Sequence, residues 1–184
     1  MSYIRLFLFI LALNFSFSAV ECENGVADGY PCSNVDLLSR LSLSQLGNPG
    51  NANDIWGWVD PVTGDPYALL GLDTGTAFIR ITDPENPLII GYLPTHSSAS
   101  LWRDIKTWGN YAYITTEANA GLLIVDLTDL TGNTSWHVSQ FTNPTTGASI
   151  SFTSAHNIYI DENGIAYIFG AGGSGPQPNG AIFL

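Results

Sequence analysis

Positive charge is scarce in this chain of 184 residues, which holds 5 Lys and Arg but 16 Asp and Glu and has a formal net charge of −11. Nucleic-acid binding requires a basic stripe that neutralises phosphates, and none occurs, so this class of function is excluded. An acidic surface instead suits solubility or surroundings that are rich in cations. Beyond residue 18 the basic residues are Arg40, Arg80, Arg103 and Lys106.

Several familiar motifs are also missing. No apolar helical period of about ten residues occurs, so the sequence does not predict a parallel βαβ fold. No G-x-S-x-G motif is present to support a serine hydrolase of the α/β type. Residues 170–175 formally satisfy G-x-G-x-x-G, but Pro176 and Pro178 follow where a helix would be required. Dinucleotide binding is therefore rejected.

The N-terminal residues 1–18 predict a cleaved secretory signal peptide. Arg5 supplies one positive charge, and the apolar run Leu6–Leu13 follows it. That run is too short to span a bilayer, and the small residues Ser16 and Ser18 suit a cleavage site. We therefore expect a secreted, extracellular or cell-surface protein with no membrane span in this part of the chain.

Cysteine is limited to Cys22 and Cys32, which lie in a lead-in segment of residues 19–50. Outside the cytosol such a pair predicts a disulfide, and the short loop it closes would contribute about 2–3 kcal/mol to stability. No histidine or third cysteine lies nearby to favour a metal site. Asn34 is a candidate cap for a short helix from Val35, although the alternating residues 41–46 also suit a strand.

Three similar segments make up most of the remaining chain: Asn53–Pro84, Trp102–Leu130 and His156–Leu184. Their runs of Tyr, Ile, Val, Thr and Trp are short and end at Gly, Asn, Asp or Pro, which predicts strands. Repetition of a small β unit at roughly fifty residues is typical of a propeller or a similar array. Two positions match in every copy: Ile55, Ile105 and Ile158 in one, and Tyr67, Tyr113 and Tyr167 in the other.

Turn residues divide each repeat into antiparallel strands. Hairpins are predicted at Gly64-Asp65, Gly109-Asn110 and Asn163-Gly164, and Leu88–Leu93 supplies a fourth strand. The predicted fold is all-β, a partial β-propeller over residues 51–184 with two complete four-stranded blades and a truncated third. Since incomplete blades cannot close a ring, we expect an N-terminal fragment of a longer protein, with a closed small barrel as the alternative.

Three stretches together carry a family resemblance: GVADGYPCSNVDLLSRLSL, WRDIKTWGNYAYITTEANAGLLIVDLTDL and SAHNIYIDENGIAYIFG. They resemble the secreted choice-of-anchor B proteins, which are built from LVIVD repeats, and the match covers Cys22–Leu184. The resemblance implies an exported bacterial β-propeller, frequently with a separate C-terminal anchoring segment. It implies no established reaction.

Polar residues align at the start of each repeat's first strand, at Asn53-Asp54, Arg103-Asp104 and His156-Asn157. In a propeller the innermost strands line the central channel, so Asp54, Asp104 and His156 are candidate ligands for a divalent cation. The alternative is structural, because Asp and Asn at such positions commonly accept hydrogen bonds from nearby backbone amides.

Aromatic residues supply the other candidate surface, and Trp56, Trp58, Trp102, Trp108 and Trp136 suit stacking on glycans. Trp58 and Trp108 occupy matching repeat positions, which favours packing between blades. His96 and His137 lie in polar stretches, and neither is assigned a role.

The leading functional hypothesis is a secreted or surface-displayed propeller that binds an extracellular protein or glycan without performing a reaction. The alternative is a metal-dependent hydrolase or lyase at the channel mouth. A third option is a structural repeat in a cell-surface array.

Overall fold

The computed structural model describes residues 19–143, 145–173 and 180–183, and within them all regular structure is β. This confirms the all-β prediction. The predicted signal peptide and part of the glycine-rich motif lie outside the described residues. In the described part of the chain, no helix is long and apolar enough to cross a membrane.

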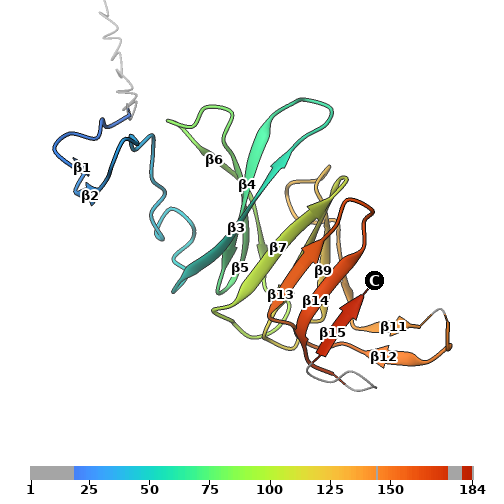
Figure 1. Ribbon diagram of the computed structural model, residues 1–184. Helices are drawn as coiled ribbons and strands as arrows, with labels where there is room; N and C mark the ends of the chain where they lie inside the picture. The colour runs from blue at the N-terminus through green and yellow to red at the C-terminus, as the bar shows by residue number, and fades with distance from the viewer. Residues whose placement is uncertain (1–18, 144, 174–179, 184) are drawn as a thin grey trace, which may run out of the picture.

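Two four-stranded antiparallel sheets and one three-stranded antiparallel sheet follow one another along the chain (Figure 1). The first sheet runs in the order β3 (Ala52–Val59), β4 (Pro66–Leu72), β5 (Gly75–Arg80) and β6 (Leu88–Pro94). The second contains β7 (Arg103–Trp108), β8 (Tyr111–Thr116), β9 (Leu122–Asp126) and β10 (Ser135–Val138). The third contains β13 (Asn157–Ile160), β14 (Ala166–Ala171) and β15 (Gly180–Phe183).

Two small hairpins complete the described strands. One pairs β1 (Val26–Ala27) with β2 (Tyr30–Pro31) in the lead-in segment. The other pairs β11 (Gln140–Thr142) with β12 (Ser149–Ser151) between the second and third sheets.

The predicted hairpins lie where the turn residues indicated. Gly109 and Asn110 alone connect β7 to β8, and residues 161–165 connect β13 to β14. In that second loop the Asp161 carboxylate accepts hydrogen bonds from the amides of Asn163 and Ile165, each at 2.9 Å. The first hairpins of the second and third sheets therefore follow from local turn chemistry.

The sheets pack on one another through two apolar clusters. The cluster between the first and second sheets contains Trp58, Leu69, Phe78, Ile105 and other residues of both sheets. The cluster around the third sheet contains Leu122, Phe152, Ile158, Ile168 and their neighbours. Phe78 of β5 and Leu123 and Val125 of β9 are buried in the first of these clusters.

The lead-in segment contains the predicted disulfide, with the Cα atoms of Cys22 and Cys32 5.9 Å apart. The helix predicted from Val35 is absent, because Asn34 has a left-handed backbone (φ 56°) where a cap needs an extended one. The alternative strand at residues 41–46 is absent too.

A reciprocal turn forms a few residues later in the lead-in segment. The Ser42 amide donates to Gln45 Oε1 at 2.9 Å, and the Gln45 amide donates to Ser42 Oγ at 3.4 Å. This is the S-x-x-Q pattern of a capping box, used here for a single turn. The turn lets Leu41 and Leu46 pack against Leu72 and Ile79 of the first sheet.

Candidate functional site

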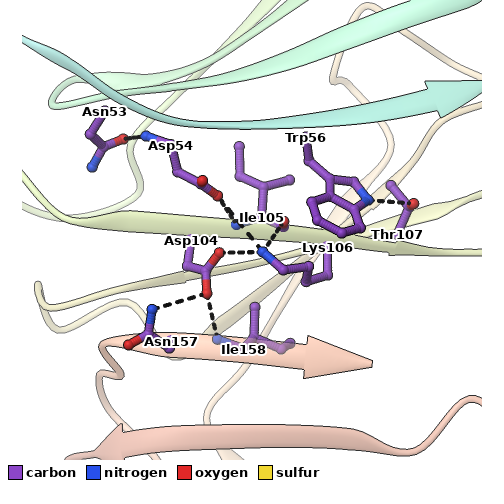
Figure 2. Close-up of polar contacts among 9 residues, drawn as sticks. All are labelled: Asn53, Asp54, Trp56, Asp104, Ile105, Lys106, Thr107, Asn157 and Ile158. Atoms are coloured by element: carbon purple, nitrogen blue, oxygen red, sulfur yellow. Dashed lines mark hydrogen bonds and ion pairs between the residues drawn. The ribbon is translucent and has the colours of Figure 1, made fainter. Parts of the chain in front are cut away.

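The first strands of the three sheets, β3, β7 and β13, are neighbours in space although about fifty residues separate them in sequence (Figures 1 and 2). Each is an edge strand, hydrogen-bonded on one side only. An edge strand presents a row of amide and carbonyl groups that its own sheet does not pair. An acceptor side chain at the start of one of these strands can therefore reach an unpaired amide of the next sheet.

The two aspartates at these positions accept such donors in the same way. Asp54 Oδ2 accepts the amide of Ile105 at 2.9 Å, and Asp104 Oδ2 accepts the amide of Ile158 at 2.7 Å. Figure 2 shows both bonds crossing from one first strand to the next. The structural alternative of the sequence analysis is thus observed, with the amides supplied by the neighbouring sheet.

Lys106 joins the two aspartates from the middle strand. Its Nζ lies 2.6 Å from Asp104 Oδ1 and 3.9 Å from Asp54 Oδ2, and it donates to the Ile105 carbonyl at 2.8 Å. It also lies 4.3 Å from the centre of the Trp56 ring, which is a cation–π contact. Trp56 Nε1 in turn donates to Thr107 Oγ1 at 3.0 Å.

The two carboxyl groups have opposite shifts in pKa. Burial raises the pKa of Asp54, and the neighbouring Asp104 adds to this effect. Burial would also raise the pKa of Asp104, but hydrogen bonds from Lys106 and the Ile158 amide outweigh it, so the pKa of Asp104 is lowered. Asp104 is therefore the principal partner of the Lys106 ammonium.

Asn157 holds the matching position in the third sheet. Its Nδ2 donates to Asp104 Oδ2 at 3.3 Å, so the oxygen that accepts the Ile158 amide has a second donor. Asp104 thus has donors from Lys106, Asn157 and Ile158, whereas Asp54 has the Ile105 amide and the more distant Lys106.

His156, the third predicted metal ligand, has a different partner. Its Nδ1 lies 2.6 Å from Glu117 Oε1, in the connection after β8. The structure therefore brings Asp54 and Asp104 together around an ammonium and places His156 in a separate pair. Among the described residues, no group of three or more His, Cys, Asp or Glu side chains is arranged to hold a metal ion.

Sequence reasoning missed Lys106 and Glu117. Lys106 stands where the other repeats have Trp56 and Tyr159, so the repeat pattern hides it. Its signal is the spacing from Asp104, because residues two apart on a strand point to the same face. Glu117 carries no comparable signal, since its partner lies 39 residues away along the chain.

Arg103 is buried beside this network, with 4% of its surface exposed. Its Nε donates to the carbonyl of Leu72 at 2.9 Å, which ties the start of β7 to the end of β4. Burial lowers the pKa of its guanidinium. Arg103 thus fixes the chain immediately after Trp102.

Comparison of the chain with protein-family models, with curated proteins and with solved structures gave no match.

Proposed function

We propose that the three sheets are consecutive blades of a β-propeller resembling the choice-of-anchor B proteins, and that the protein is a secreted or surface-displayed binding module. Two features support a propeller. The sheets share one meander order, and their first strands are neighbours, since β7 contacts both β3 and β13. A radial array of four-stranded sheets has this arrangement.

The observation that carries the binding function is that Asp54 and Asp104 have structural roles. Their carboxylates accept backbone amides of the next sheet and neutralise Lys106, so the best candidates for chemistry serve to hold the sheets together. A rigid stack of this kind presents its loops at fixed positions, and binding surfaces are commonly built on such loops.

An extracellular location fits the same proposal. The Cys22–Cys32 disulfide is of the type found in secreted proteins. The expected partners are an extracellular protein or a glycan.

The alternative, a metal-dependent hydrolase or lyase, has one observation in its favour: Asp54 and Asp104 both approach a single cation, the Lys106 ammonium. The same observation makes it the second choice, because Lys106 already supplies the positive charge that a divalent ion would bring.

A paired experiment tests the proposal. The protein without residues 1–18 is screened against glycan and extracellular-protein arrays, and its melting temperature is measured with and without EDTA. We expect at least one ligand and a melting temperature that EDTA leaves unchanged. A stoichiometric bound metal that is lost in Asp104→Ala, or arrays without any binding, would contradict the proposal.

A further inference from the structure

Three side chains that have no part in the aspartate network meet at the same ends of the first strands. Trp102 immediately precedes β7, Glu117 immediately follows β8, and His156 immediately precedes β13. The loops of two adjacent sheets therefore contribute to one place on the surface.

The distances define a compact group. Glu117 Oε1 and His156 Nδ1 are 2.6 Å apart, and the ring centres of His156 and Trp102 are 5.9 Å apart with a tilt of 58°. The side chains of His156 and Glu117 are 51% and 45% exposed, and Trp102 is 48% exposed. All three groups are thus open to a ligand from solvent.

The backbone beneath these side chains is firmly held. The Ala155 amide donates to the Thr116 carbonyl at 2.9 Å, and the His156 amide donates to the Phe169 carbonyl at 3.0 Å. Gly170 lies directly under His156, since a Cβ at this glycine would be 3.0 Å from the His156 Cβ. Its φ of 63° also favours glycine. The group is positioned before any ligand arrives, which lowers the entropic cost of binding.

We propose that Trp102, Glu117 and His156 form a binding site for one uncharged sugar ring. This inference rests on the proposed binding function and names its ligand class. A half-exposed indole offers a flat apolar face on which the C–H face of a pyranose can lie. The Glu117 carboxylate accepts hydrogen bonds from the sugar hydroxyl groups. The His156 ring nitrogen that does not face Glu117 forms one more hydrogen bond with the sugar, as donor or acceptor. Glu117 and the net charge of −11 disfavour acidic sugars.

The test uses cellotriose and maltotriose as neutral probes and trigalacturonate as the acidic probe. Binding is followed through the indole N–H signals of the protein in two-dimensional NMR spectra, and the Trp102 signal is assigned from its loss in Trp102→Phe. We expect at least one neutral trisaccharide, at millimolar concentration, to shift the Trp102 signal. Trigalacturonate should bind at least about tenfold more weakly.

Variants locate the site. Trp102→Ala should weaken binding at least about tenfold, and Glu117→Gln should weaken it several-fold. Trp136→Ala is the matched control, because Trp136 is 47% exposed and lies on β10. This control should keep its affinity. Unchanged melting temperatures show that each variant is folded.

Two results would overturn the inference. One is that no neutral trisaccharide shifts the Trp102 signal. The other is that Trp136→Ala loses as much affinity as Trp102→Ala, which would place sugar binding elsewhere. Both leave the proposed function standing, provided that the arrays described above still yield a ligand.

Discussion

The two junctions between sheets are formed by residues at the same repeat positions. These residues differ in burial both at the hairpin end of the first strands and at the end where the aspartates lie. Between the first and second sheets, Trp58 is 7% exposed and its Nε1 donates to the Gly109 carbonyl at 3.1 Å. Between the second and third sheets, the matching Trp108 is 43% exposed and lines a cavity of about 270 Å³. The aspartate ends show the reverse, since the side chain of Asp54 is 35% exposed and that of Asp104 is 12% exposed.

The first junction is thus closed by apolar packing at its hairpin end, and the second by polar contacts at its aspartate end. Position in a repeat fixes which backbone groups a side chain faces. The burial of a side chain depends on which residues of the next sheet pack against it. Around Trp108 the described residues are all uncharged and leave the cavity unfilled. Equivalent residues therefore differ in their contribution to stability.

The largest difference is expected for the paired tryptophans. Trp58→Ala should lower the free energy of unfolding by about 4 kcal/mol, because a buried ring and its hydrogen bond to Gly109 are both lost. Trp108→Ala should cost about 1 kcal/mol, since the ring is already half in water. Urea denaturation measures both, and equal losses would contradict the comparison.

The paired aspartates should show the opposite ranking. Asp104→Ala should cost about 3 kcal/mol, because Lys106 loses its close partner and the buried Ile158 amide loses its acceptor. Asp54→Ala should cost about 1.5 kcal/mol, since one amide is affected and the side chain is partly hydrated. Asp83→Ala, in an exposed turn, is the control for removal of a carboxylate. A larger loss for Asp54 than for Asp104 would reject this ranking.

Matched alanines test the cavity itself. Ala166 lines the cavity, whereas Ala112, at the equivalent place after the preceding hairpin, is fully buried in the first junction. Ala166→Leu should stabilise the protein by about 1 kcal/mol as it fills space, and Ala112→Leu should destabilise it by about 2 kcal/mol as it overpacks. Calorimetry gives both melting temperatures, and shifts of the same sign would show that the junctions are packed alike.

The smallest effect concerns pH. The rings of His96 and His137 stack with centres 3.8 Å apart, joining the connection after β6 to β10. Burial lowers the pKa of His137, and His96 lowers it further, while a hydrogen bond with the Ala120 carbonyl opposes the shift. The folded state disfavours protonated His137. Its contribution to the free energy of unfolding should therefore be complete above the ordinary histidine pKa and should be lost as the pH falls through the lowered pKa of His137.

This pH effect is measured by urea midpoints between neutral pH and pH values below the ordinary histidine range, for the protein and for His137→Phe. The variant should lose less stability on acidification than the unmodified protein. An identical pH dependence would remove His137 as the cause.

The local features of this fold were accessible from sequence. Asn163-Gly164 and Gly109-Asn110 specified hairpins because their preferences act within a few residues. The prediction of a helix in the lead-in segment was wrong, because the left-handed backbone at Asn34 and the packing of Leu41 on the first sheet determine the conformation of that segment.

The site was only partly accessible from sequence. Asp54 and Asp104 were found through their shared repeat position, but their acceptance of amides from the next sheet required the stacking of the sheets. The pairing of His156 with Glu117 joins two connections that lie on different sheets, and no spacing rule predicts it.

The central claim is that an aspartate at the start of one first strand holds the backbone amide of the next. Hydrogen exchange at the amides of Ile105 and Ile158 tests it most directly. In the unmodified protein both should be protected. In Asp104→Ala the Ile158 amide should lose at least about tenfold more protection than the Ile105 amide, which shares only the general loss of stability. Continued protection of Ile158, or equal loss at both amides, would contradict the account.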